Sequence, residues 1–433
     1  MKKAVAVLLS ALLLLATAPM GVYAAGADDL MYEIVGDEVT IVGCDPSVDG
    51  HLVIPDTIEG HPVTTIGAEA FFQCESLDSV TIPDSVTTID EYAFYGCSWL
   101  ASVLGGNGVT TIGQYAFYEC NWLQEMAFSD SLTSIGKSAF YHCWKLPSLT
   151  VPGTVTEIGD YAFYDCNGLT TLTIGDGVEV IGDFAFYSCG KLTALTIPDS
   201  VTLIGDSAFY YCGKISSLII GDGVRTIGNM AFHRLEGMKA LTIGSGVQTI
   251  GEWAFYGCDA LTALVIPDNV VTIGVGAFSY SDALISVTIG HGVQTIGADA
   301  FTACPNLQTV NLGIGITAVE QFAFYGCPAL TEVFYAGSLS DWQKIRFGQS
   351  NDELLGAARH YDSDITTVVV VAGDVNGDGK INNRDLGLLQ QHLNGWDVKT
   401  HTVGADANAN GVVNNRDLGL LQQYLNGWNV LLG

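Results

Sequence analysis

An alanine–phenylalanine pair recurs every 23 residues along most of this 433-residue chain, and this period constrains the fold more than any other feature. Twelve phenylalanines follow the period without one insertion or deletion: Phe71, Phe94, Phe117, Phe140, Phe163, Phe186, Phe209, Phe232, Phe255, Phe278, Phe301 and Phe324. An isoleucine or valine lies five residues before each of them, and an apolar residue lies six residues after. One such unit has too few apolar groups to fold alone, whereas stacked units bury a continuous core. The period therefore predicts a solenoid of twelve coils stacked in register.

A second apolar pair, nine and eleven residues after the repeat phenylalanine, predicts the secondary structure of each coil. Leu172 with Ile174 and Leu195 with Ile197 alternate with polar residues, as in a half-buried strand. A Pro-Asp or Gly-Asp turn follows the pair. The pattern predicts one short strand per coil and, at a strand spacing of about 4.8 Å, a rod about 55 Å long.

The repeat resembles a known family. Residues 195–212, LTIPDSVTLIGDSAFYYC, are similar to the BspA-like class of bacterial leucine-rich repeats, and the resemblance extends over about 30–362. It implies a leucine-rich-repeat solenoid over residues 63–330, an N-terminal cap over 25–62 and a C-terminal cap over 331–362. Caps are also expected physically, because a terminal coil would otherwise expose the core.

Ten of the eleven cysteines lie three residues after a repeat phenylalanine, and only Cys44 is out of phase. The position is occupied by Leu235 in one repeat and by Ser281 in another, which favours a small or apolar buried group. We therefore expect a column of buried thiols. Disulfides between adjacent coils are the alternative, although parallel side chains disfavour the dihedral angle that a disulfide needs. Zinc is disfavoured because the histidines do not share the phase of the cysteines.

Other periodic residues are candidates for the surface. A tyrosine directly follows most repeat phenylalanines, at Tyr95, Tyr118, Tyr141, Tyr164, Tyr187, Tyr210, Tyr256 and Tyr325. This series is either a half-buried structural ladder, which we favour, or an aromatic strip that stacks on sugars or partner side chains. Asp160, Asp183 and Asp206 form either a solvated face, which we favour, or a weak cation site. Outward strand positions are mostly threonine, and the repeats carry no His-Glu-x-x-His or Gly-x-Ser-x-Gly motif.

Two near-copies of a twelve-residue loop lie 32 residues apart near the C-terminus and have the spacing of calcium loops. Alternate residues of such a loop direct oxygen atoms towards one hard cation, and a glycine permits the sharp turn. The predicted ligands of the first loop are Asp374, Asn376, Asp378, the Lys380 carbonyl, Asn382 and Asp385. Those of the second are Asp406, Asn408, Asn410, the Val412 carbonyl, Asn414 and Asp417. The cofactor is therefore Ca²⁺ at two sites, and the second loop, with fewer carboxylates, is expected to bind more weakly.

One helix is expected after each loop, over 386–393 and 418–425, and none before it. This duplicated loop–helix unit resembles a type I dockerin over 373–433, a small all-α module with two EF-hand-like motifs. The resemblance implies that the partner is a cohesin domain of a cellulosome scaffold. It also implies that cohesin is recognised by Asn383, Arg384, Gln390 and Gln391 and by their equivalents Asn415, Arg416, Gln422 and Gln423. Because the two copies are nearly identical, we hypothesise that cohesin can engage either face.

Charge and the N-terminus indicate where the chain works. With 46 acidic and 16 basic residues, the net charge of −30 excludes a nucleic-acid binder that neutralises phosphates, and it disfavours docking on anionic membranes. Lys2 and Lys3 precede an apolar run, and Ala24 ends a cleavage-like motif. Residues 1–24 are therefore predicted to be a secretory signal peptide, with a retained membrane anchor as the alternative. Residues 363–372 read as a linker.

Together these features predict a secreted, non-catalytic interaction protein that a calcium-stabilised dockerin attaches to a polysaccharide-degrading complex. The solenoid would present a protein- or glycan-binding surface. The first alternative is a structural spacer or inhibitor within the complex. The second is an accessory glycoside hydrolase, which is disfavoured because a paired-carboxylate site needs a cleft and the unbroken period leaves no insertion to build one.

Overall fold

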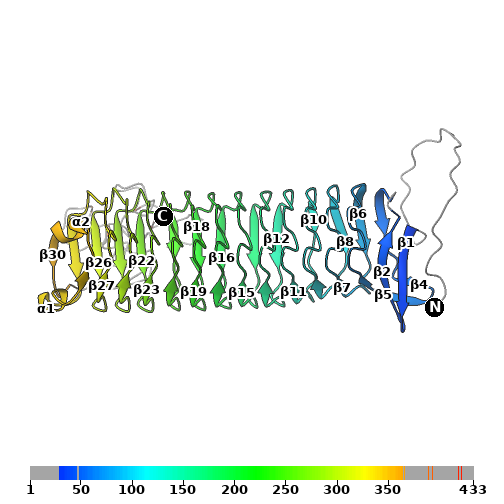
Figure 1. Ribbon diagram of the computed structural model, residues 1–433, viewed down its shortest axis with the longest axis horizontal. Helices are drawn as coiled ribbons and strands as arrows, with labels where there is room; N and C mark the ends of the chain where they lie inside the picture. Colours follow the sequence, from blue (N-terminus) through cyan, green and yellow to red (C-terminus); the bar gives the residue numbers. More distant parts are fainter. Residues whose placement is uncertain are drawn as a thin grey trace.

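The computed structural model describes residues 29–45 and 48–363, together with the single residues 365, 389, 393, 418 and 421. Successive coils lie side by side along a straight rod that runs from an N-terminal cap to a C-terminal cap (Figure 1). The predicted signal peptide, nearly all of the linker, the calcium ligands and the cohesin-recognition residues lie outside the described residues. The solenoid that the repeat predicts is confirmed.

One long sheet of sixteen strands runs the length of the rod and contains a two-residue strand from nearly every coil. Neighbouring repeat strands are parallel and in register, so that Ile89 pairs with Ile112 and Ile112 with Ile135. In order along the path the strands are β1 (Leu30–Val35), β2 (Glu38–Cys44), β5 (His61–Ile66), β7 (Thr88–Ile89), β9 (Thr111–Ile112), β11 (Ser134–Ile135), β13 (Glu157–Ile158), β15 (Val180–Ile181), β17 (Leu203–Ile204), β19 (Thr226–Ile227), β21 (Thr249–Ile250), β23 (Thr272–Ile273), β25 (Thr295–Ile296), β27 (Ala318–Val319) and β29 (Arg346–Phe347), with β4 (Thr57–Ile58) paired to β5 off this path.

A second series of strands is divided into four shorter parallel sheets. They comprise β3 (Gly50–Val53), β6 (Leu77–Ile82), β8 (Ser102–Gly105) and β10 (Glu125–Met126); β12 (Ser148–Val151) and β14 (Thr171–Ile174); β16 (Ala194–Ile197), β18 (Ser217–Ile220) and β20 (Ala240–Thr242); and β22 (Ala263–Ile266), β24 (Ser286–Ile289), β26 (Thr309–Leu312), β28 (Glu332–Tyr335) and β30 (Ala358–His360). These are the strands that the second apolar pair predicts.

The expectation of one strand per coil is corrected, because each regular coil contributes a strand to both series. The additional strand contains the isoleucine that lies five residues before the repeat phenylalanine, as in Thr88–Ile89. Two residues are too few to produce the alternation by which a strand is recognised in a sequence. The isoleucine was therefore predicted as a core residue but not as part of a strand.

The core is a set of columns along the rod axis. The repeat phenylalanines are buried, and their rings stack from coil to coil with centroid distances of 4.8 Å for Phe71–Phe94 and 5.2 Å for Phe301–Phe324. The bend around each phenylalanine places the residues two before and two after it in the left-handed region, as for Tyr161 (φ 57°) and Asp165 (φ 56°). Two left-handed residues per coil turn the chain between its two strands.

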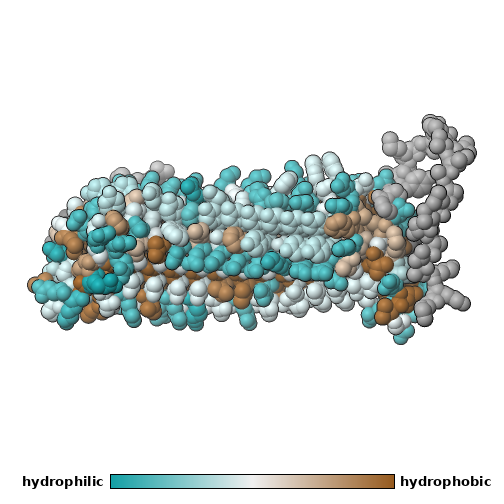
Figure 2. Space-filling model, in the orientation of Figure 1, coloured by the Kyte–Doolittle hydropathy of each residue, from teal (hydrophilic) through white to brown (hydrophobic). Residues whose placement is uncertain are grey.

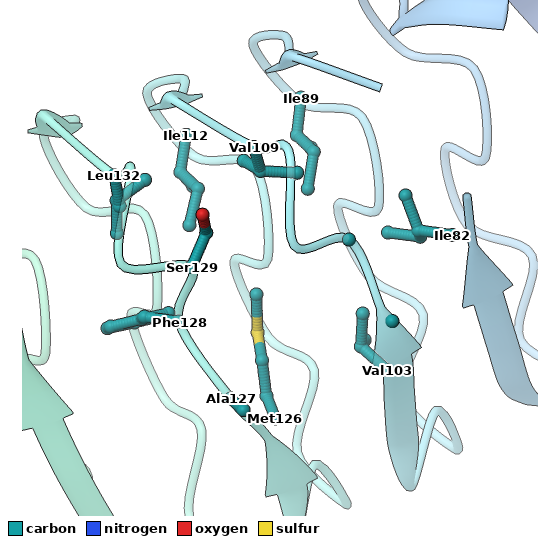
Figure 3. A pocket seen from close by; sticks show the side chains of 12 residues that line it. Ile82, Ile89, Val103, Val109, Ile112, Met126, Ala127, Phe128, Ser129 and Leu132 are labelled. Carbon is teal, nitrogen blue, oxygen red and sulfur yellow. The ribbon is translucent and has the colours of Figure 1, made fainter. Parts of the chain in front are cut away.

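One irregular stretch interrupts the columns, where Gly105 and Phe128 occupy the position that holds Ile82 in the first repeat. Gly105 has φ +75°, and a Cβ there would lie 2.4 Å from the carbonyl oxygen of Ile82, so only glycine fits. Together with Met126 and Phe128 it lines a void of about 10 Å³ (Figure 3). The sheet of β3, β6, β8 and β10 ends at this stretch.

Both ends of the solenoid are covered. At the N-terminal end the antiparallel β1–β2 hairpin lies on the first coil, where β2 pairs with β5. At the C-terminal end β29 and β30 extend the two series of strands, and the short helices α1 (Leu339–Trp342) and α2 (Asp352–Gly356) bury Trp342 and Leu354. Hydrophobic residues gather near the N-terminal cap, whereas hydrophilic and neutral residues dominate the middle of the face in Figure 2.

Candidate interaction surface

The tyrosines that follow the repeat phenylalanines form a stacked ladder. Tyr118, Tyr141, Tyr164 and Tyr187 stack at centroid distances of 4.6 Å with interplanar angles of 3–7°. His233 continues the ladder between Tyr210 and Tyr256 at 4.4 and 4.6 Å. Burial raises the pKa of Tyr118 to about 12. Because each ring covers the face of the next, the geometry supports the structural alternative over stacking on sugars.

The cysteine column is buried, and all eleven cysteines are free thiols in the structure. Eight of the column thiols donate a hydrogen bond to the carbonyl oxygen of the phenylalanine 26 residues earlier, as Cys97 does to Phe71 (3.0 Å) and Cys166 to Phe140 (3.2 Å). A cysteine at this position thus fills a small apolar site and also gives a buried carbonyl a donor. The burial that the sequence predicts for this column is confirmed.

The Asp160–Asp183–Asp206 series joins coils rather than only facing solvent. The Asp160 carboxylate accepts the backbone N–H of Asp183 (3.0 Å), and Asp183 accepts that of Asp206 (2.7 Å). Asp206 and Asn229 continue the series by accepting the backbone N–H groups of Asn229 and Glu252. Neither sequence expectation anticipated this role. Within the described part of the chain, no group of three or more histidine, cysteine, aspartate or glutamate side chains is arranged to hold a metal ion.

Three exposed tryptophans form what we call the aromatic edge, defined as Trp99, Trp122 and Trp144 with the adjacent His142 and Lys145. The indoles belong to three consecutive coils and are 55%, 41% and 45% exposed. Trp99 and Trp122 stack at 5.4 Å, and the Lys145 ammonium lies 5.0 Å from the centre of the Trp122 ring. Large aromatic side chains exposed together on a turn are typical of an interaction surface.

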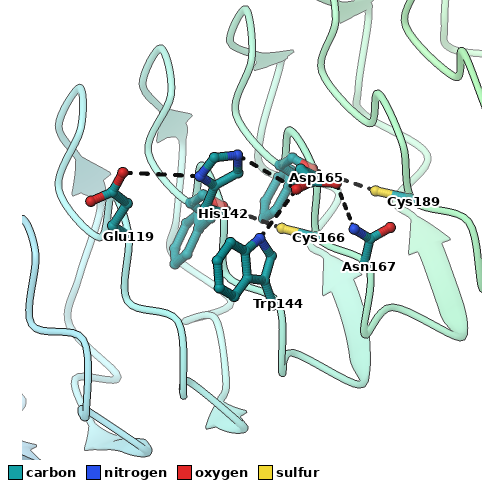
Figure 4. Close-up of polar contacts among 9 residues, drawn as sticks. Glu119, His142, Trp144, Asp165, Cys166, Asn167 and Cys189 are labelled. Carbon is teal, nitrogen blue, oxygen red and sulfur yellow. Dashed lines mark hydrogen bonds and ion pairs between the residues drawn. The ribbon is translucent and has the colours of Figure 1, made fainter.

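A polar cluster fixes one end of the aromatic edge (Figure 4). His142 lies between two carboxylates, 4.0 Å from Glu119 and 3.5 Å from Asp165. Asp165 also accepts hydrogen bonds from the Trp144 indole N–H (3.2 Å) and from the Asn167 amide (2.5 Å). Asp165 therefore orients both the imidazole of His142 and the indole of Trp144.

The sequence pattern did not predict the aromatic edge or this cluster. Glu119, His142 and Asp165 all lie two residues after a repeat phenylalanine, and the tryptophans lie four or five residues after one. An alignment of the repeats by the period, followed by inspection of the variable columns rather than the invariant ones, would have placed them together. The signal was present in the non-repeating residues of a repeating chain.

A shallow hollow of about 310 Å³ lies further along the same turns. It forms where Gly190 and Gly213 stand at the position that holds Trp144 in an earlier coil. Tyr211 and Arg234 line it, and the Arg234 guanidinium lies 5.9 Å from the Tyr211 ring. The hollow extends the uneven surface of this edge beyond the tryptophans.

The predicted calcium ligands and cohesin-recognition residues lie outside the described residues. Four described residues fall within the two helices expected there: Leu389, Leu393, Leu418 and Leu421 are helical, and Leu389 and Leu421 are buried. These positions agree with the expected helices and do not test the sites.

The family comparisons agree with the repeat and the C-terminal motif. A model of the BspA type leucine rich repeat region matches residues 52–170, 156–284 and 225–352, and the chain belongs to this family. A model of the dockerin type I domain matches residues 372–426. No curated protein matches the chain.

Several solved structures are similar to this chain. A leucine rich cell surface protein from Faecalibacterium prausnitzii is 28% identical over 76% of this chain and 99% of that one, with a TM-score of 0.45. A leucine-rich repeat protein from Bacteroides ovatus is 24% identical over 77% of this chain and 98% of that one, with a TM-score of 0.47. A leucine rich repeat protein of T. pallidum is 25% identical over 50% and 91%, with a TM-score of 0.39.

The two modules define the general role of the chain. Leucine-rich repeats present protein-binding surfaces, and a dockerin binds cohesin in cellulosome-type assemblies. Type I dockerins bind calcium, and both modules are typically non-catalytic and found outside the cell or on its surface. Among the described residues, no helix is long and apolar enough to cross a membrane.

Proposed function

We propose that this chain is a secreted, non-catalytic adaptor that brings a protein partner to a cohesin-bearing scaffold in a polysaccharide-degrading complex. The dockerin at 373–433 supplies calcium-dependent attachment, and the solenoid supplies a binding surface. The observation that carries the solenoid's part is the aromatic edge, where three indoles, each at least 41% exposed, stand on consecutive coils.

The aromatic edge is better suited to binding than the strand surfaces. Outward strand positions carry small polar residues such as Thr150 and Thr196, which offer little area to bury. Tryptophan is enriched among the residues that dominate binding energy in interfaces, and its rigid side chain buries a large area with little loss of conformational freedom. The contact of Asp165 with His142 and its hydrogen bond from the Trp144 indole hold both side chains in place before binding, which reduces the entropy lost on association.

The geometry favours a protein partner over a glycan. A sugar ring stacks on an open aromatic face, but Trp99 and Trp122 cover each other and Lys145 lies over the Trp122 ring. The Tyr ladder is likewise stacked face to face. The exposed parts of the three tryptophans suit the irregular surface of a folded protein better than a flat sugar ring.

The remaining assignments follow from the sequence and stay proposals. Residues 1–24 are proposed as the signal peptide, 25–62 and 331–362 as the caps, 63–330 as the solenoid and 363–372 as the linker. The twelve calcium ligands and eight cohesin-recognition residues are proposed at the positions given above. A structural spacer is the second candidate, because the rod is straight and unbroken (Figure 1).

To test this, a cell-surface extract is passed over the immobilised mature protein in the presence of calcium. Bound proteins are then eluted first with a chelator and afterwards with denaturant. A cohesin protein is expected in the chelator eluate, and the solenoid's partner is expected only in the denaturant eluate. The variant Trp99→Ala with Trp122→Ala and Trp144→Ala should lose the second protein and keep the first. A matched control, Tyr280→Ala with Tyr325→Ala, removes exposed aromatic rings elsewhere on the rod and should lose neither.

Each outcome separates the candidates. If the tryptophan variant retains the partner, binding does not use the aromatic edge. If nothing is held until denaturant, the spacer function is favoured, whereas turnover of polysaccharides by the mature protein would establish an enzyme. If the chelator elutes no cohesin, the attachment to a scaffold is wrong.

The duplicated recognition residues give a further test of the dockerin. If cohesin can engage either face, Arg384→Ala and Arg416→Ala should each leave the affinity nearly unchanged, because the other face remains. The double variant should bind at least tenfold more weakly, as measured by titration calorimetry. Unchanged affinity of the double variant would show that these arginines are not the contact.

A further inference from the structure

Two thiols of the described chain meet at the N-terminal cap. The sulfur of Cys44, the last residue of β2, lies 2.9 Å from the sulfur of Cys74, which belongs to the bend of the first repeat. Both side chains are buried, each with 7% of its surface exposed. Cys44 is the single cysteine outside the 23-residue phase, so the repeat does not account for it.

The hydrogen bonding of this pair differs from that of the cysteine column. Eight column thiols donate to the carbonyl of the repeat phenylalanine 26 residues earlier, as Cys97 does to Phe71. For Cys74 the residue 26 positions earlier is Val48, which belongs to the cap and not to a repeat. Its sulfur contacts Cys44 instead, and this contact makes the two sulfurs partners.

The contact also prepares one thiol to react. A hydrogen bond from the Cys44 S–H stabilises the thiolate of Cys74 and lowers the pKa of Cys74, while the pKa of Cys44 is raised. The thiolate is the nucleophile in thiol–disulfide exchange, so Cys74 is the attacking sulfur.

We propose that Cys44 and Cys74 form a disulfide that locks the N-terminal cap onto the first coil. The oxidant is a small or protein disulfide, R–S–S–R. The Cys74 thiolate attacks one of its sulfurs and releases R–S⁻, which leaves a mixed disulfide. The Cys44 thiolate then attacks the Cys74 sulfur and releases a second R–S⁻. Overall, the two cysteine S–H bonds and the S–S bond of the oxidant are broken and the Cys44–Cys74 S–S bond forms, while the two protons pass through solvent to the two released thiolates, which become thiols.

The position of this bond explains what it would do. The cap is already joined to the first coil through β2 and β5, where Val39 pairs with Val63 and Ile41 with Ile66. The disulfide adds a second attachment at the far end of β2, beside the bend that holds Phe71. Locking the cap keeps the end of the apolar core covered, as the terminal coil of a solenoid requires.

The other end of the cysteine column provides an internal comparison. Cys304 and Cys327 lie on consecutive coils, and both are buried. Each thiol donates to a phenylalanine carbonyl, Cys304 to Phe278 at 3.5 Å and Cys327 to Phe301 at 3.2 Å, so neither proton is directed at the other sulfur. We therefore assign the bond to Cys44 and Cys74 alone and expect the other nine cysteines to stay reduced.

The test is thiol counting and peptide mapping on the full chain folded in a glutathione redox buffer. The protein is denatured in the presence of iodoacetamide, which alkylates free thiols, with and without prior reduction, and its mass is measured. Nine of the eleven cysteines should be alkylated without reductant, and all eleven after reduction. Cleavage after glutamate should release a linked pair of peptides, residues 39–59 and 70–75, which contain Cys44 and Cys74 respectively.

Variants make the assignment specific. Cys44→Ser and Cys74→Ser should each leave ten free thiols and no linked peptide, whereas Cys97→Ser, which alters a column thiol, should keep the linked pair. Alkylation of all eleven cysteines without reductant would overturn the proposal. A link that joins any other pair, including Cys304 to Cys327, would overturn it as well.

Discussion

At the scale of single residues, the closest approaches between coils occur at glycines. A Cβ on Gly177 would lie 1.8 Å from the Gly153 carbonyl oxygen, whereas a Cβ on Gly190 would meet nothing closer than 3.7 Å. Gly177→Ala should therefore lower the free energy of unfolding by about 2 kcal/mol or more, and Gly190→Ala by less than about 0.5 kcal/mol. Urea denaturation measures both. Equal losses would mean that the coils can separate slightly without cost.

A second prediction at this scale concerns His233, which takes a tyrosine position in the stacked ladder. Its Nδ1 has no hydrogen-bond partner, and burial, followed by the neighbouring Arg234 charge, lowers its pKa from 6.5 to about 4. The folded state therefore disfavours the protonated ring. The unfolded state binds more protons between about pH 6.5 and 4, so this site's stability is complete above 6.5 and is lost as the pH falls towards 4.

The variant His233→Tyr isolates this effect, because it restores the residue found in neighbouring coils, Tyr210 and Tyr256. Between pH 7 and 4.5 the native protein should lose about 1–2 kcal/mol more stability than the variant. Denaturation curves at both pH values measure the difference, and groups that titrate in both proteins cancel. A parallel loss in the two proteins would show that His233 is not the sensitive group.

At the scale of the coil, the aspartate series predicts how neighbouring turns are joined. Asp183 accepts the backbone N–H of Asp206, and Asn229 does the same for Glu252. Asp183→Ala should cost about 1 kcal/mol, because a backbone donor loses its partner. Asp183→Asn should be nearly neutral, because an amide oxygen accepts equally well. If the series bound cations instead, both substitutions would weaken calcium binding equally, and a calcium titration of the solenoid would measure that loss.

The elements also show how far the sequence could lead. The period and its apolar positions suffice to predict the solenoid, the buried columns and the longer strands, because the same pattern occurs in all twelve repeats. The two-residue strands could not be recognised in the sequence, because they are defined by their pairing with neighbouring coils and are too short to show an alternating pattern. The void beside Gly105 and the aromatic edge lie in residues that break the repeat, so their neighbours become known only when coils are stacked.

At the scale of the whole molecule, a coil of the rod contacts mainly its neighbours, so the solenoid needs no help from a distant module to stay folded. The dockerin is different, because calcium loops contribute folding energy only when the metal is bound. The two parts should therefore respond separately to calcium. This separation is what an adaptor requires, since one partner can be released while the other stays bound.

Calcium removal tests this separation directly. A chelator should abolish cohesin binding and reduce the helical circular dichroism signal, while the solenoid's unfolding midpoint and its partner, held at the aromatic edge, stay unchanged. Asp374→Ala with Asp406→Ala, which removes the first ligand of each proposed loop, should reproduce the chelator's effect in the presence of calcium. Asp183→Asn, which removes a carboxylate from the rod, is the control and should change neither cohesin binding nor binding of the solenoid's partner. Release of both partners by the chelator would contradict the separate response of the two parts to calcium.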